Sequence, residues 1–125
     1  MHQTGRRTLL RPGREAEYEA VHAAVPQVVL DALRAAGVLR WTIWRDGRSL
    51  FHAIDTVAGY DALLAALARL GPLDHAWDAV IADLLEDGQD SDVLLPAVWA
   101  MDRSGQGRPA DPEAQDAGGP GERRA

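Results

Sequence analysis

The chain has 125 residues, 46% of them hydrophobic, and its 13 basic and 19 acidic residues give a net charge of −6. This length predicts one domain with a single packed core, and the negative charge argues against a nucleic acid or an anionic membrane as a partner. The sequence contains no cysteine, which excludes thiolate catalysis, disulfides and cysteine-based zinc sites.

Two features of the hydropathy pattern concern location and domain limits. No stretch has the roughly 20 consecutive apolar residues of a membrane span, and no apolar run suited to a signal peptide follows the basic start. We therefore expect a cytoplasmic protein without a membrane partner. Residues 102–125 lack Val, Ile, Leu, Phe, Trp, Tyr and Met, while Gly and Pro recur. This composition predicts a globular domain over residues 1–101 and a disordered tail over residues 102–125.

The first third of the chain predicts a strand followed by two helices. Residues 6–10 suit a short strand, and Pro12-Gly13 then turns the chain. The Ala, Glu and Tyr content of residues 15–24 favours a helix. Pro26 suits the first turn of a second helix, whose partial apolar stripe ends at Gly37.

The middle of the chain predicts a β-hairpin. Residues 38–45 alternate as a strand does, which places Trp41 and Trp44 on opposite faces. Asp46-Gly47 is a strong hairpin signal, so residues 50–55 are expected to return as an antiparallel strand.

The remaining elements complete the predicted fold. Leucines at helical spacing predict a helix over residues 60–70, and Gly71-Pro72 separates it from another over residues 75–84. Residues 94–101 predict a last strand, interrupted at its start by Pro96. The order is therefore that of a ferredoxin-like β-α-β-β-α-β subunit of the α+β class, with helices on one face of an antiparallel sheet.

The two strand tryptophans indicate how such a sheet is covered. Because Trp41 and Trp44 lie on opposite faces of one strand, neither face of the sheet is expected to be freely solvated. Two sheets that pack together in a homodimer meet this condition most simply.

A tyrosine and a histidine stand four residues apart in the first predicted helix. This spacing places Tyr18 and His22 on one face of an α-helix, where a bound ligand can exchange protons with both. Histidine titrates near neutral pH, which suits it to general acid and base catalysis. The pair is therefore a candidate proton-transfer site.

Several segments carry a resemblance to a known family. They are Arg11 to His22, Gly37 followed by Trp41 to Asp46, Leu50-Phe51, and Val98-Trp99. In these segments and in element order, residues 5–101 resemble the L-rhamnose mutarotase family. The resemblance implies a dimeric α/β barrel of ferredoxin-like subunits, an isomerase that interconverts the α and β anomers of L-rhamnose without a cofactor. It also implies catalytic and sugar-contacting roles for Tyr18 and His22.

Other side chains are candidates for binding the substrate, a monosaccharide. An indole face packs well against the C–H face of a sugar while polar groups hold its hydroxyls. The candidates are Trp41, Trp44, Trp77, His52 and His75. Each also has a structural interpretation, in the core or at a dimer interface, and no ligand spacing supports a metal site among the histidines.

Two alternative functions stay open on the sequence. One is a cofactor-free cyclase or monooxygenase on the same dimeric barrel, because one fold hosts several chemistries. The other is a non-catalytic sugar-binding dimer. The polarity of the pocket distinguishes a sugar site from a long, mainly apolar one, and the substrate itself is either L-rhamnose or a related aldose.

Overall fold

A computed structural model gives the fold of the chain and describes residues 1–108. These residues divide between two compact units, Met1–Leu94 and the part that begins at Leu95. The first unit holds four strands and four helices in the predicted order. They are β1 (His2–Leu9), α1 (Glu15–His22), α2 (Gln27–Ala35), β2 (Val38–Asp46), β3 (Ser49–Thr56), α3 (Tyr60–Leu70), α4 (His75–Leu84) and β4 (Asp92–Leu95).

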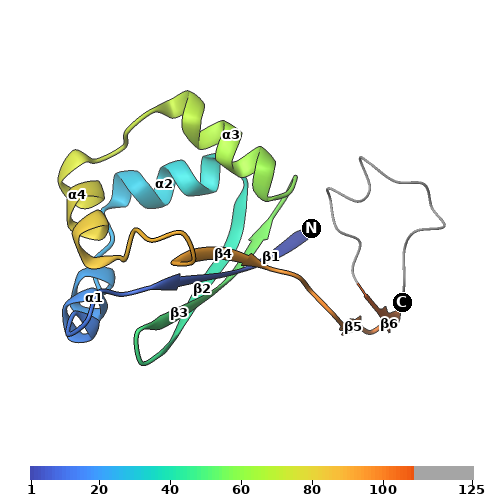
Figure 1. Cartoon of the computed structure of the whole chain (residues 1–125). Helices are drawn as coiled ribbons and strands as arrows, with labels where there is room; N and C mark the ends of the chain where they lie inside the picture. Colours follow the sequence, from blue (N-terminus) through green and yellow to red (C-terminus); the bar gives the residue numbers. More distant parts are fainter. Residues whose placement is uncertain (109–125) are drawn as a thin grey trace. The chain divides into compact units, whose positions relative to one another are not determined.

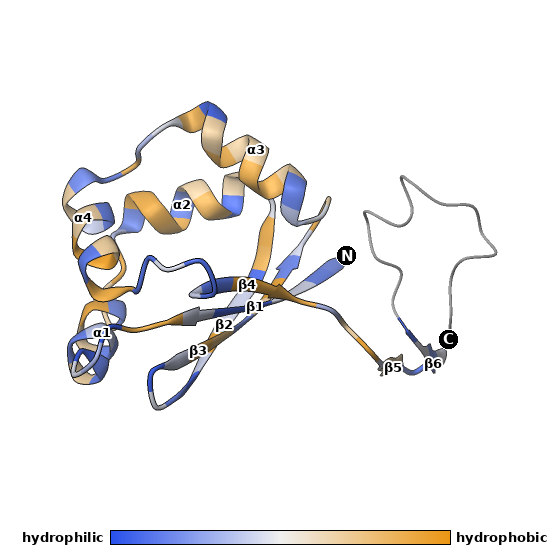
Figure 2. Cartoon of the chain, viewed as in Figure 1, coloured by the Kyte–Doolittle hydropathy of each residue, from blue (hydrophilic) through white to orange (hydrophobic). Residues whose placement is uncertain are grey.

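One four-stranded sheet, in the order β2-β3-β1-β4, organises the first unit. Strand β3 pairs antiparallel with both β1 and β2. Helices α2, α3 and α4 lie together on one side of this sheet (Figure 1). Each of these helices carries both hydrophobic and hydrophilic residues (Figure 2), as expected of helices with one face on a core. The mixed α+β class with an antiparallel sheet is thereby confirmed.

The β2–β3 hairpin forms where Asp46-Gly47 predicted it. Asp46 pairs with Ser49, so the turn contains two residues, and Gly47 has a φ of 59°. A residue without a Cβ adopts this left-handed conformation at little cost, which explains glycine at this place in a tight hairpin.

The core lies between the sheet and the helices. Leu10, Leu50 and Leu84 are fully buried, and Tyr18 of α1 packs with them in one cluster. Residues at even positions of β3 face this core, since Leu50, His52 and Ile54 are all buried. The first helix is therefore fixed against the sheet by the same tyrosine that the sequence places in the candidate site.

The predicted last strand over residues 94–101 is wrong in its limits. Strand β4 covers Asp92–Leu95 and ends directly before Pro96, which has no backbone N–H to donate to a sheet. The second unit contains a short antiparallel hairpin, β5 (Ala100–Asp102) and β6 (Gly105–Gly107). Most of the tail predicted to be disordered, residues 109–125, lies outside the described residues.

Candidate active site

Tyr18 and His22 lie one above the other on α1, as their spacing predicted. Their ring centroids are 4.1 Å apart, with 31° between the ring planes. Trp77, on α4, also contacts the histidine, in a T-shaped arrangement with a centroid distance of 5.3 Å and 62° between the ring planes. The imidazole of His22 therefore contacts two aromatic rings that come from different helices.

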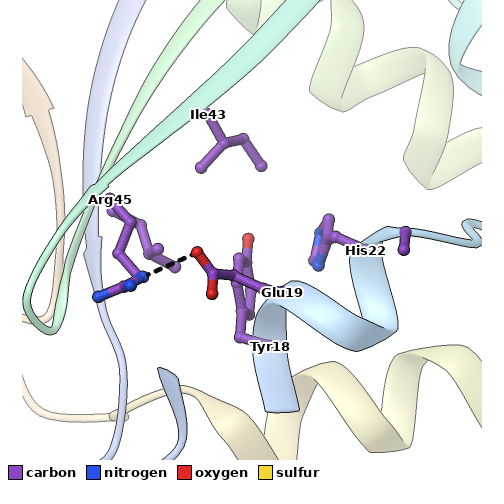
Figure 3. A pocket seen from close by; sticks show the side chains of 7 residues that line it. Tyr18, Glu19, His22, Ile43 and Arg45 are labelled. Carbon is purple, nitrogen blue, oxygen red and sulfur yellow. Dashed lines mark hydrogen bonds and ion pairs between the residues drawn. The ribbon is translucent and has the colours of Figure 1, made fainter. Parts of the chain in front are cut away.

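A pocket opens beside this pair, between α1 and the strands β2 and β3 (Figure 3). Its volume is about 300 Å³. The lining combines four polar or ionisable side chains with three apolar ones: Tyr18, Glu19, His22 and Arg45, with Ala23, Ile43 and Leu50. Both predicted catalytic residues thus face one cavity.

Burial determines the protonation state of Tyr18. The side chain is only 6% exposed, and burial raises its pKa to about 12 although the Arg6 guanidinium acts in the opposite direction. Arg6 is itself held in place, since its Nε and Nη2 donate to the two carboxylate oxygens of Asp92 at 2.8 and 2.6 Å. Tyr18 therefore keeps its proton near neutral pH and can donate it.

Burial acts on His22 in the direction that favours the neutral ring. It lowers the pKa of His22, and the backbone carbonyl of Tyr18 offsets this effect in part. The Nδ1 atom of His22 is buried and has no hydrogen-bond partner among residues 1–108. His22 forms part of the pocket wall, and a neutral imidazole can accept a proton.

His52 is engaged on both sides of its ring. The indole Nε1 of Trp41 donates to Nδ1 at 3.1 Å, and Nε2 lies 2.9 Å from the Thr8 hydroxyl oxygen. Because an indole nitrogen can only donate, Nδ1 accepts, and the proton of the neutral ring stays on Nε2 and is donated to Thr8. Burial, assisted by the charge of Arg6, lowers the pKa of His52 to about 4.

The remaining predicted site residues occupy different places. Trp41 is half-buried and shares its strand face with Ile43 of the pocket, two residues along. Trp44 pairs with Phe51 on the opposite face of the sheet and is 58% exposed. His75 is exposed on α4. Among the residues that the structure describes, no three His, Asp or Glu side chains gather as possible metal ligands.

Sequence analysis did not identify two of the pocket's polar residues, Glu19 and Arg45. Their signals were present, however. Glu19 stands three residues before His22, which places it on a neighbouring part of the helix surface, and Arg45 follows Ile43 on the same strand face. Only the packing of α1 against β2 brings the two side chains together.

The fold and the pocket define a small α+β protein with a stacked tyrosine–histidine pair on its first helix, facing a pocket. No helix in residues 1–108 is long and apolar enough to cross a membrane. The chain belongs to the L-rhamnose mutarotase family, because the family model described as L-rhamnose mutarotase matches residues 3–102. Mutarotases are isomerases that interconvert the anomers of a sugar.

Individual relatives agree with this assignment. The chain is 36% identical over 97 residues to an L-rhamnose mutarotase of Burkholderia orbicola, across 76% of this chain and 90% of that protein. It is 35% identical over 103 residues to an L-rhamnose mutarotase of Verminephrobacter eiseniae, across 77% and 92% of the two chains. These alignments extend over nearly the full length of both relatives.

Two solved structures share the fold at low sequence identity. The L-rhamnose mutarotase of Formosa agariphila aligns with a TM-score of 0.61 and 17% identity, covering 82% of this chain and 100% of that one. Tetracenomycin F2 cyclase of Streptomyces glaucescens, a type-II polyketide cyclase, aligns with a TM-score of 0.55 and 18% identity, covering 82% and 100%. The architecture alone is therefore common to proteins with different chemistry.

Proposed function

We propose that this protein interconverts the α and β anomers of L-rhamnose or a related aldose, with His22 and Tyr18 as its catalytic residues. The observation that carries the proposal is the stacked pair on α1, which faces the pocket. Family membership supports the reaction type, and the geometry of the pair supports the roles of the two residues.

The pair suits the proton transfers that mutarotation needs. His22 takes the proton from the anomeric hydroxyl while Tyr18 donates its proton to the ring oxygen, so that the bond between C1 and the ring oxygen breaks and an open-chain aldehyde forms. Rotation about the C1–C2 bond presents the other carbonyl face to the ring oxygen. Closure then returns both protons to their residues, and no atom or electron is gained or lost.

The electrostatics of the pair favour this assignment over the reverse. A lowered pKa keeps His22 neutral and able to accept a proton near neutral pH. A pKa of about 12 keeps Tyr18 protonated and able to donate. Trp77 contacts the ring of His22 from α4 but does not line the pocket, so its role in sugar binding stays a prediction.

The small size of the pocket and the ionisable side chains on its walls favour a sugar over a polyaromatic substrate. A volume of about 300 Å³ is at the lower end of the range for small-molecule pockets, about 300–1,000 Å³. Ionisable side chains line it on both the helix and the strand side. A cyclase of polyketide chemistry would need a longer cavity.

Saturation-transfer NMR with L-rhamnose and L-fucose tests the reaction. The protein is expected to accelerate exchange between the α and β anomeric proton signals of at least one sugar above the rate in buffer. A variant with His75→Ala is the matched control, because this histidine is exposed on α4 and is expected to be dispensable. Ligand binding with exchange no faster than in buffer would indicate a non-catalytic sugar-binding protein.

We further propose that the subunit is ferredoxin-like and pairs through its open sheet face into a homodimeric barrel. The strand order β2-β3-β1-β4 supports the first part. On the face away from the helices, Trp44 is 58% exposed beside Phe51, 37% exposed. On that face Arg7 Nε and Asp55 Oδ1 are buried and have no hydrogen-bond partner in the described part of the chain. A second sheet would cover the aromatic rings and reach these polar atoms.

Replacement of Trp44 by glutamate is expected to convert the dimer to monomers, because a charge then stands where an aromatic contact is proposed. Light scattering coupled to gel filtration measures the mass. The control is Leu64→Glu, a similarly exposed apolar residue (47%) on helix α3. A wild-type protein that elutes with the mass of one chain would contradict the homodimer.

A further inference from the structure

One ion pair joins the two walls of the pocket. Arg45 extends from β2 and Glu19 from α1, and Nε of the arginine donates to Oε1 of the glutamate at 3.3 Å (Figure 3). The two residues are 26 positions apart in sequence, and both line the cavity that Tyr18 and His22 face. Charged groups therefore lie within the candidate site, in addition to the catalytic pair.

A second contact fixes the arginine. Its Nη1 donates to the backbone carbonyl of Gly47 in the hairpin turn at 3.0 Å. Neither Nη2 of Arg45 nor Oε2 of Glu19 has a hydrogen bond in the part of the chain that the structure describes. The hydrogen bonds of the pair thus leave one donor atom of Arg45 and one acceptor atom of Glu19 unused.

Stability does not explain this arrangement. Both side chains are substantially accessible, at 32% for Arg45 and 60% for Glu19, and ion pairs of this kind contribute little to folding. The combined charge of the pair is zero, which suits a neutral ligand. Two adjacent hydroxyls of a sugar match the unused atoms, because one hydroxyl can donate to a carboxylate oxygen while its neighbour accepts from a guanidinium N–H.

We propose that Glu19 and Arg45 determine substrate specificity by binding two adjacent hydroxyls of the aldopyranose whose anomeric carbon lies at His22. This inference rests on the proposed mutarotase function and refines it, since it makes a vicinal diol a requirement of the substrate. The two residues hold the sugar and take no part in proton transfer at the anomeric centre.

Kinetics of the single variants measure the contribution of each side chain. Hydrogen bonds to charged groups correspond to about 10- to 100-fold in affinity. Glu19→Gln and Arg45→Met are each expected to raise KM for anomer exchange of L-rhamnose by about that factor, with kcat within about threefold of wild type because the proton-transfer groups are unchanged. One of the 2-, 3- and 4-deoxy analogues of the sugar lacks the hydroxyl that the side chain contacts. With that analogue, the wild-type protein and the variant are expected to have the same KM.

A charge-swapped double variant, Glu19→Arg with Arg45→Glu, separates sugar binding from a structural role. An ion pair that only ties α1 to β2 works in either orientation, so the swap would restore KM. A pair that binds a diol has a defined donor and acceptor position, and KM is expected to stay raised. The control is Glu86→Gln, which removes the similarly exposed, long-range pair of Arg48 and Glu86 (3.2 Å) outside the pocket.

The possible outcomes are distinct. Wild-type KM values in Glu19→Gln and Arg45→Met, or recovery in the charge-swapped variant, overturn the specificity role while the mutarotase function stands. Absence of exchange above the buffer rate in the wild-type protein itself overturns the proposed function, and the inference with it.

Discussion

Replacement of His22 by alanine is expected to lower the rate of anomer exchange by a factor of about 10² to 10⁴, the usual contribution of a positioned general base. In the wild-type protein, kcat/KM is expected to fall on the acidic side with a midpoint below 6.5, because burial lowers the pKa of His22 and only the neutral ring accepts a proton. No alkaline decrease is expected until the pH approaches about 12, where Tyr18 ionises.

Saturation-transfer NMR between pH 4.5 and 9 measures this profile for the wild type, His22→Ala and Tyr18→Phe. His22→Ala is expected to lose the acidic limb along with most of the rate. If His22→Ala retained the wild-type rate of anomer exchange at neutral pH, the role assigned to His22 would be disproved. If Tyr18→Phe remained fully active, water rather than the phenol would be the proton donor.

The free energy of unfolding is expected to decrease as the pH falls from 6.5 to about 4, chiefly because of His52. The pKa of this histidine is lowered from 6.5 to about 4 in the folded protein, so the unfolded chain binds the proton more readily throughout this interval. The stabilisation that comes from the neutral ring of His52 is therefore fully present above the unfolded pKa of 6.5. It is lost as the pH falls from 6.5 to about 4. A histidine that is only 7% exposed contributes on the order of 3 kcal/mol over a shift of this size.

Urea unfolding, followed by tryptophan fluorescence at a series of pH values, tests this expectation. The variant His52→Gln has no titrating ring and is expected to lose most of the slope between pH 4 and 6.5, while its stability at pH 8 falls only by the cost of imperfect contacts with Trp41 and Thr8. His22→Ala serves for comparison, because the pKa of His22 in the wild-type protein is also lowered by burial and therefore affects stability in the same direction. An unchanged slope in His52→Gln would show that another group is responsible.

The local sequence was sufficient to predict those features that depend on short spacings. The spacing of four positions from Tyr18 to His22 determines that the rings share a helix face, whichever sheet the helix packs on. In the same way, Asp46-Gly47 between two alternating segments predicts a tight hairpin, which the structure closes with Gly47 and Arg48 as its two turn residues. The order of elements followed from such signals, but the limits of two strands were misplaced: β1 begins at His2 and not at residue 6, and the last strand ends before Pro96.

The tertiary structure alone decided which distant side chains meet. Glu19 and Arg45 become neighbours because α1 packs against β2, at a distance in sequence that no helical or strand period links. The sequence left open whether His52 binds substrate or has a structural role, and the pairing of three strands supplies Thr8 and Trp41 to its two ring nitrogens. The helical and strand periods and the residue preferences of turns act over a few residues, so they can be recognised along the sequence. The packing of helix on sheet and the register between strands are determined only when the core is packed in the folded protein.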